Sequence, residues 1–168
     1  VQTEGIRDVR LRPVDPLVVL FSTLPRLEQR RRDRNVEVEP VVHDQVPRIV
    51  CDPRSLERIL FHLLDNAIKF SPAGKRVQVE FVVNGSRLDI RVRDGGIGIA
   101  PDRLQQIFES FYQIDGRLTR NYEGLGLGLT VTRMLLAATR GEIRVESAPG
   151  EGSVFTISYP LADTRERH

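Results

Sequence analysis

The stretch at residues 52–74 constrains the fold of this chain most, because it contains both a start signal and a stop signal for a helix. Asp52 offers a side-chain acceptor to the first N–H groups of a helix, and Pro53 suits the first helical position because an N–H there would have no partner. The run PRSLERILFHLLDNAIKF predicts a helix over 53–70, and SPAG at 71–74 ends it. The apolar residues of this helix predict a surface that faces the core: Leu60, Leu63, Leu64, Ala67 and Ile68.

Alternating apolar and polar residues on both sides of this helix predict β-strands. The runs RVQVEFVV and RLDIRVRD flank the turn residues NGS at 84–86, which is the pattern of a β-hairpin. Upstream, the runs at 36–42 and 48–52 predict two strands around a turn near Pro47. Downstream, residues 141–161 predict a second hairpin.

The segment before these strands, residues 13–34, predicts an amphipathic helix that Pro25 weakens. Its apolar residues recur near helical spacing and are expected to face the core: Leu17, Leu20, Phe21, Leu24 and Leu27. The basic end, RLEQRRRDR at 26–34, is interrupted by acidic residues. It therefore predicts a solvated helix C-terminus rather than a binding patch.

The rest of the chain predicts a short helix over 101–111, an irregular polar stretch over 112–123 and a helix over 127–139. About three substantial helices and about six strands, several of them in hairpins, predict an α/β (α+β) two-layer sandwich. Its sheet is expected to be mixed and mostly antiparallel, packed on the helices. The length of 168 residues fits one domain.

Charge and composition exclude several classes of protein. Lysine and arginine total 25 and aspartate and glutamate total 23, and the net charge of +2 is too small to predict binding to nucleic acid or an anionic membrane. No apolar run approaches the ~18 residues that span a bilayer, and no signal peptide opens the chain. The single cysteine, Cys51, cannot form an internal disulfide, which is compatible with a reducing cytoplasm.

One face of the helix over 53–70 carries side chains that could do chemistry. His62, Asn66 and Phe70 are four residues apart and Lys69 lies three beyond Asn66, so all four share that face. An amide oxygen suits Mg²⁺, which takes few protein oxygens beside substrate phosphates. The lysine suits a phosphate and the ring suits a base. A solvent-facing polar stripe explains the same pattern.

Two glycine-rich stretches are further candidates. Asp94 ends a strand before glycines, where its carboxylate could accept a hydrogen bond from an exocyclic amine such as adenine N6, and Gly96 and Gly98 would leave space for the ring. A common Asp-Gly turn explains this stretch as well. In EGLGLGLTVTRML at 123–135, glycines precede a helix start, which suits close approach of phosphate oxygens to free N–H groups or a positive φ. The alternative is a mobile surface loop.

The order of these stretches carries a family resemblance. HLLDNAIKFS, DGGIGI, IFESFYQID and EGLGLGLTV resemble, in sequence and spacing, the N, G1, F and G2 boxes of sensor histidine kinases. The resemblance covers about residues 13–161. It implies the catalytic and ATP-binding domain of that family, an α/β sandwich of the Bergerat or GHKL type that is shared with the gyrase, heat-shock chaperone and mismatch-repair ATPases.

By position, the resemblance implies a role for each matching residue. Asn66 would be the Mg²⁺ ligand, Lys69 would contact phosphate, and both would be catalytic together with Arg120, a lid residue that reaches the phosphates. The implied base contacts are Phe70, which stacks on adenine, Asp94, which accepts from N6, and the pocket residues Gly96, Gly98 and Ile99. Around the lid at 112–123, the implied anchors are Phe108 and Phe111, and the implied phosphate-binding stretch is Gly124, Leu125, Gly126, Leu127 and Gly128.

This chain departs from the family pattern at several positions. His62 stands where the family often has an asparagine and where the related ATPases have a water-activating glutamate, which argues against ATP hydrolysis as the main activity. Whether His62 supports the site or is a surface residue stays open. Gly95 replaces a frequent asparagine, and Arg140-Gly141 replaces a common Gly-Gly in a turn. In the family, the phosphoacceptor box is a histidine on a long dimerising helix, followed by an acid and, a little later, a proline. HDQVP at 43–47 is similar to this box, but its proline comes one residue early and it lies among strands, so we reject His43 as the phosphoacceptor.

The resemblance thus implies one ATP-binding domain over 1–161, a frayed tail over 162–168, and no phosphoacceptor domain in this chain. The implied activity is that of a protein-histidine kinase, which binds ATP or ADP with Mg²⁺ and passes the γ-phosphoryl group to a histidine of a dimerisation domain, in cis or in trans. A response regulator would follow in the two-component pathway. We expect a cytoplasmic monomer, free or attached to a membrane-associated sensor. The alternatives are a degenerate nucleotide-binding regulatory module without phosphotransfer, and a gyrase-type ATPase that would lack its glutamate.

Overall fold

The computed structural model describes residues 9–98 and 126–162, and within these it omits the side chains of residues 126–130. In chain order the elements are β1 (Arg12–Val14), α2 (Pro16–Thr23), the 3₁₀ helix η1 (Leu24–Leu27), α3 (Glu28–Arg34), β2 (Glu37–Val41), β3 (Ile49–Cys51), α4 (Pro53–Phe70), β4 (Arg76–Asn84), β5 (Arg87–Asp94), α7 (Gly126–Ala138), β6 (Glu142–Ala148) and β7 (Gly152–Pro160). The helix over 53–70 and both hairpins are confirmed.

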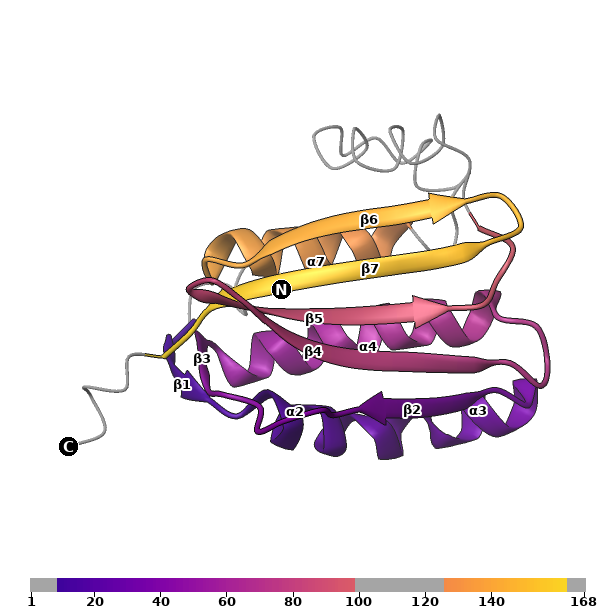
Figure 1. The fold of residues 1–168 in the computed structure, drawn as a ribbon, viewed down its shortest axis with the longest axis horizontal. Helices are drawn as coiled ribbons and strands as arrows, with labels where there is room; N and C mark the ends of the chain where they lie inside the picture. The colour runs from indigo at the N-terminus through magenta and orange to yellow at the C-terminus, as the bar shows by residue number, and fades with distance from the viewer. Residues whose placement is uncertain (1–8, 99–125, 163–168) are drawn as a thin grey trace.

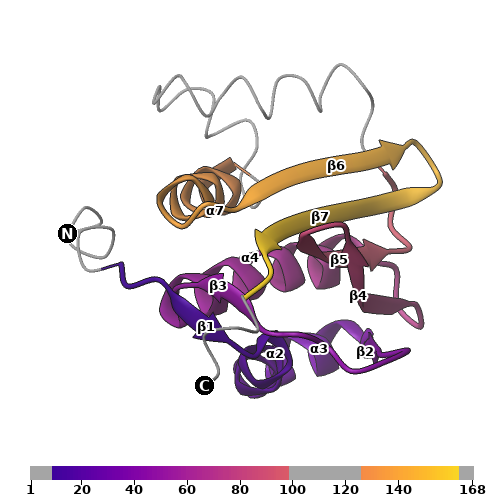
Figure 2. The same ribbon diagram turned by 60° about the vertical axis from the view of Figure 1, so that its left-hand side comes forward.

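Five strands form the main sheet in the order β2-β4-β5-β7-β6 (Figure 1). Strand β2 pairs with β4 in parallel, and the other neighbours are antiparallel. The helices cover one face of this sheet, as the turned view shows (Figure 2). This arrangement confirms the predicted sandwich with its mixed, mostly antiparallel sheet.

The two strands around Pro47 do not pair with each other. β2 lies at an edge of the main sheet, whereas β3 pairs with β1 in a separate two-stranded sheet. Strand β1 was not predicted, because three residues with a central proline carry too little pattern to indicate a strand. The pairing partner of each strand is a long-range property that neither run encodes locally.

Helix α4 forms where its local signals place it. The Oδ1 atom of Asp52 accepts hydrogen bonds from the N–H groups of Arg54 at 2.9 Å and Ser55 at 3.1 Å, which caps the first turn. The five residues predicted to face the core are all buried: Leu60, Leu63, Leu64, Ala67 and Ile68. They pack in one hydrophobic core with residues of the sheet and of α7.

Residues 16–34 form three short helical pieces instead of the single helix predicted for 13–34. A 3₁₀ turn that contains Pro25 separates α2 from α3, because a proline cannot donate its part of the α-helical ladder. Phe21 was expected in the core, and this prediction is wrong, since the side chain is 55 % exposed. The buried stripe of α2 runs through Val19 and Leu20, and one residue further turns the side chain of Phe21 by about 100° toward solvent.

The last helix begins slightly earlier than predicted. Because α7 starts at Gly126, both Gly126 and Gly128 have helical backbone and do not form a lead-in of positive φ. At its other end, Arg140 takes a left-handed φ of 63° and Gly141 donates its N–H to the carbonyl of Leu136 at 2.8 Å. The Arg140-Gly141 departure therefore lies in the turn between α7 and β6. None of the described helices combines the length and the apolar character that crossing a bilayer requires.

Candidate functional site

The carboxylate of Asp94 ends strand β5 and is held in one orientation. The side chain is 7 % exposed. Its Oδ1 atom accepts hydrogen bonds from the N–H of Gly96 at 2.9 Å and from the N–H of Ser153 at 3.2 Å. Of the described residues, none donates to Oδ2, so that oxygen is available to accept from a ligand.

Burial is the main influence on this carboxylate and raises the pKa of Asp94, while the N–H groups of Gly96 and Ser153 lower the pKa in part. The ionised form therefore carries a cost that two backbone donors only partly offset. A buried carboxylate with an unused oxygen at the end of a strand suits a ligand that brings its own hydrogen-bond donor. It is also an Asp-Gly turn, so both interpretations from the sequence describe the same local geometry.

Two of the glycines after Asp94, Gly96 and Gly98, are required by backbone packing. A Cβ on Gly96 would collide with the carbonyl oxygen of Phe70, at the end of α4. Gly98 has a φ of +77°, and a Cβ there would collide with the carbonyl of Ala148 in β6. The missing side chains thus let the loop after β5 fit between α4 and the β6–β7 hairpin. The space for a ring that we expected at Gly96 and Gly98 stays a prediction.

The four side chains on the polar face of α4 lie in different environments. Asn66 is buried at 6 % exposed, Lys69 is exposed, and both His62 and Phe70 are half-buried. Since the carbonyl of Phe70 packs against Gly96, the C-terminal turn of α4 adjoins the loop that follows Asp94. The structure thus brings Lys69 and Phe70 to the same end of the sandwich as the carboxylate.

His62 contacts an apolar neighbour. Its ring meets that of Phe61 edge-on, with centroids 5.8 Å apart. Burial lowers the pKa of His62, the positive charges of Arg58 and Arg26 lower it further, and Asp65 opposes them. The imidazole is therefore held toward its neutral form, which is compatible with either of the two roles left open.

Several predicted site residues lie outside the described part of the chain. These are Ile99, Phe108, Phe111, Arg120, Gly124 and Leu125, together with the side chain of Leu127. Their assigned roles stay predictions.

One contact of the site was not predicted. The β6–β7 hairpin brings Ser153 beside Asp94, and a Cβ on the preceding Gly152 would collide with the carbonyl of Asp94. Ser153 also shares a hydrogen bond between hydroxyl groups with Ser147, at 2.7 Å. The glycine at 152, in the run APGEGS, is the only local signal of this approach, because residue 153 is far from residue 94 in sequence.

Residues 51–163 match the family described as "Histidine kinase-, DNA gyrase B-, and HSP90-like ATPase". The chain belongs to this family. The predicted resemblance to sensor histidine kinases and the GHKL fold are thereby confirmed.

The relatives are much longer proteins. The chain is 39 % identical over 156 residues to an uncharacterized sensor-like histidine kinase of Rhizobium meliloti, a match that covers 93 % of this chain and 30 % of that protein. It is 41 % identical over 152 residues to the autoinducer 2 sensor kinase/phosphatase LuxQ of Vibrio vulnificus, covering 84 % of this chain and 18 % of LuxQ. The chain thus corresponds to less than a third of either relative.

A solved structure supports the same assignment. Full-length ShkA in complex with AMPPNP has a TM-score of 0.76 and 32 % sequence identity, over 94 % of this chain and 32 % of ShkA. A family member of this fold thus binds an ATP analogue.

Proposed function

We propose that this chain binds ATP with Mg²⁺ and donates the γ-phosphoryl group to a histidine on a separate phosphoacceptor domain, as the catalytic domain of a protein-histidine kinase. The observation that carries the proposal is the carboxylate of Asp94, which is buried and pinned through Oδ1 while Oδ2 is available. Such an oxygen accepts the exocyclic N–H of adenine, whereas the 6-oxo group of guanine would face it with a second acceptor.

The remaining contacts are proposed from position. Phe70, at the end of α4, would lie against the base, and the ammonium group of Lys69 would meet the phosphates. Arg120 and the glycines at 124, 126 and 128 would also meet the phosphates. Positioning and electrostatic stabilisation are the means of catalysis open to such a site, since phosphoryl transfer needs little covalent chemistry from the protein.

The residues present fit a magnesium ion that arrives with the nucleotide. The described part of the chain holds no cluster of three or more His, Cys, Asp or Glu side chains, so it offers no dedicated carboxylate cage. It does offer the buried amide of Asn66 on the polar face of α4. Mg²⁺ keeps several waters and takes most of its other oxygens from phosphates, so a single amide oxygen suffices as the protein ligand. The bound ion would neutralise charge on the phosphates.

The acceptor histidine is proposed to lie on another domain. His43 is exposed in an irregular segment, where its ring faces Glu80 at 3.6 Å, and it is not on a helix. In the proposed step, an imidazole nitrogen of the acceptor forms a bond to the γ-phosphorus while the bond from that phosphorus to the bridging oxygen breaks. ADP leaves with the electron pair. The phosphoryl group would then pass to a response regulator.

We further propose that residues 1–161 form one ATP-binding unit, that the unit is monomeric by itself, and that it acts in the cytoplasm. Residues of α4 and β5 pack in the same hydrophobic core, which supports the proposal of a single unit.

Phosphotransfer tests the proposed function. The chain is joined by a flexible linker to a dimerisation and phosphoacceptor domain of a sensor histidine kinase, and γ-labelled ATP is added with Mg²⁺. We expect label that is stable to alkali and lost in acid, as for phosphohistidine, and none in an Asp94→Ala variant or with the acceptor histidine replaced. Binding of ATP without label on any acceptor domain tried would favour the regulatory module. Steady phosphate release without label would favour an ATPase.

A further inference from the structure

Arginines recur at every fourth residue along the helical segment before β2. Arg26 lies in η1, Arg30 lies in α3, and Arg34 ends α3. This spacing places the three on one side of the segment. On α4, the residues Glu57, Phe61, Asp65 and Lys69 repeat at the same interval. We call these two rows the arginine ladder.

The first two arginines of the ladder each contact one acid of α4 and the ring of Phe61. Arg26 pairs with Glu57 at 3.5 Å, and its guanidinium lies 4.6 Å from the centre of the Phe61 ring. Arg30 lies 4.9 Å from the centre of the same ring and pairs with Asp65 at 3.5 Å. The ring of Phe61 is thus contacted by two guanidinium groups, one paired with the acid four residues before it and the other with the acid four residues after it.

Arg34, the last arginine of the ladder, contacts the backbone of α4. The Nη1 atom of Arg34 donates a hydrogen bond to the carbonyl oxygen of Lys69 at 2.8 Å. That carbonyl is one of the last in α4, and such carbonyls have no partner within their own helix. A cation at this position also suits the negative end of the helix dipole. Arg34 therefore caps α4 from a neighbouring helix.

Backbone hydrogen bonds also join the residues after α3 to the residues that follow the C-terminal end of α4. The N–H of Gly74 donates to the carbonyl of Asn35 at 2.7 Å, and the N–H of Glu37 donates to the carbonyl of Lys75 at 3.3 Å. On its other side, the carbonyl of Phe70 packs against Gly96. The turn that carries Lys69 and Phe70 is thus held between the end of α3 and the loop after Asp94.

We propose that Arg34 is a positioning residue for the nucleotide site, which holds the last turn of α4 so that Lys69 meets the phosphates of ATP. This inference rests on the proposed function. Exposed ion pairs such as those of Arg26 and Arg30 contribute little to stability. Among the described contacts of these three arginines, only that of Arg34 reaches the backbone of a predicted phosphate-binding residue. The basic run at 26–34 is thus more than a solvated helix end.

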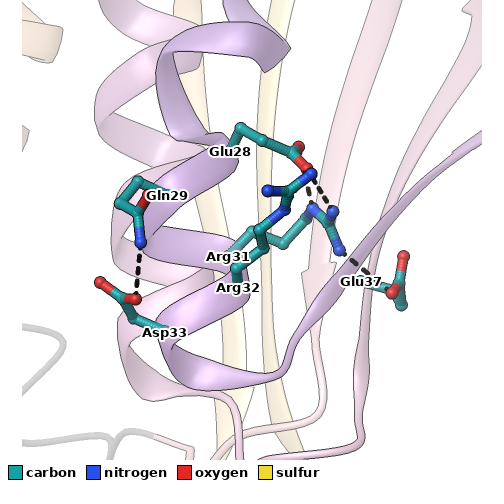
Figure 3. A network of polar contacts seen from close by, with 6 residues as sticks. All are labelled: Glu28, Gln29, Arg31, Arg32, Asp33 and Glu37. Carbon is teal, nitrogen blue, oxygen red and sulfur yellow. Dashed lines mark hydrogen bonds and ion pairs between the residues drawn. The ribbon is translucent and has the colours of Figure 1, made fainter.

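The other arginines of α3 offer a matched control. Arg31 and Arg32 both donate to Glu28, and Arg31 also reaches Glu37 (Figure 3). The contacts of Arg32 shown there stay within α3. An Arg32→Ala variant therefore removes an exposed arginine of the same helix without touching α4.

A double-mutant cycle tests the inference. The dissociation constant for ATP with Mg²⁺ is measured by calorimetry for wild type, Arg34→Ala, Lys69→Ala and the double variant, with thermal unfolding as a check that each is folded. We expect Arg34→Ala to weaken binding about three- to tenfold, less than the loss of a buried orienting partner costs, because Lys69 is exposed. If Arg34 acts through Lys69, the double variant binds no more weakly than Lys69→Ala alone.

The controls separate this role from a merely structural one. Arg34→Lys, whose ammonium can still donate to the carbonyl, should recover most of the affinity, and Arg32→Ala should bind as wild type does. Unchanged affinity in Arg34→Ala, or additive effects in the cycle, would overturn the inference while leaving the proposed function intact. A wild-type chain that binds no ATP would overturn both.

Discussion

Replacing Asp94 by asparagine should change which purine the chain prefers. The two backbone N–H groups that meet Oδ1 require an acceptor at that position. In Asp94→Asn the side-chain carbonyl must therefore take the place of Oδ1, and the amide nitrogen must take the place of Oδ2. The atom that faces the ligand changes from an acceptor into a donor.

The size of the effect follows from the bond that is lost. A hydrogen bond to a charged group contributes about 1.5–3 kcal/mol, which corresponds to roughly a 10- to 150-fold change in Kd. The new amide N–H also opposes the N6 donor of adenine. Inosine triphosphate carries an oxygen at that position, so its oxygen can accept from the new donor. We expect the ratio of the ATP and inosine triphosphate affinities to fall by at least about tenfold in the variant.

The same substitution should not weaken the fold. Because the pKa of Asp94 is raised, the native protein holds this proton more tightly than the unfolded chain does. The free energy of unfolding therefore falls as the pH rises from the ordinary value of 3.8 through the raised pKa, and the ionised carboxylate costs stability at neutral pH. Asparagine removes this cost, so the variant should unfold at pH 7 at a temperature no lower than wild type.

Calorimetric titration with both nucleotides, beside thermal unfolding, measures all of these effects. Asp94→Ala, which offers neither donor nor acceptor, serves as the control that should lose ATP binding without gaining affinity for inosine triphosphate. A folded Asp94→Asn variant that binds ATP as wild type does would refute the reasoning. So would an equal loss of affinity for both nucleotides, because the carboxylate would then not read position 6 of the purine.

Three further substitutions test the packing around the site. The hydroxyl of Thr132 is buried and has no hydrogen-bond partner among the described residues, so Thr132→Val should raise the free energy of unfolding by about 1 kcal/mol, and an unchanged or lower Tm would contradict this. Arg140 holds a φ of 63° at the end of α7, so Arg140→Gly should stabilise by about 1 kcal/mol in denaturant unfolding; a loss of stability would show that its side chain matters more than its backbone. Gly96→Ala should destabilise by about 1–3 kcal/mol, because its Cβ meets the carbonyl of Phe70. Gly95→Ala is the matched control, since the nearest described atoms to a Cβ there belong to the Lys75 side chain, at 3.8 Å, and equal effects at both positions would contradict the account.

Features encoded by neighbouring residues were predicted well. Helix α4 has its cap, its proline and its stop within a few residues of each end, and the structure begins and ends it at the predicted residues, Pro53 and Phe70. The hairpin around 84–86 is equally local. Asp94 was singled out because a carboxylate directly before glycines at a strand end is also a local pattern.

Features that depend on distant partners were not predicted. Phe21 fits a helical apolar pattern, but the core meets α2 on another side. The N–H of Ser153 reaches Asp94 only because β5 and β7 are neighbours in the sheet. The bond from Arg34 to Lys69 likewise depends on the register between two helices, which no single stretch of sequence contains. The reason for Gly96 and Gly98 was also hidden, since the carbonyls that require them come from α4 and β6.

A calorimetric titration of the chain with ATP, with and without Mg²⁺, tests the central claim most directly when Asp94→Ala and Asn66→Ala are titrated beside it. The account predicts that wild type binds ATP more tightly with Mg²⁺, that Asp94→Ala loses binding, and that Asn66→Ala still binds ATP but without the gain from Mg²⁺. A folded wild-type chain that binds no nucleotide under either condition would contradict the account.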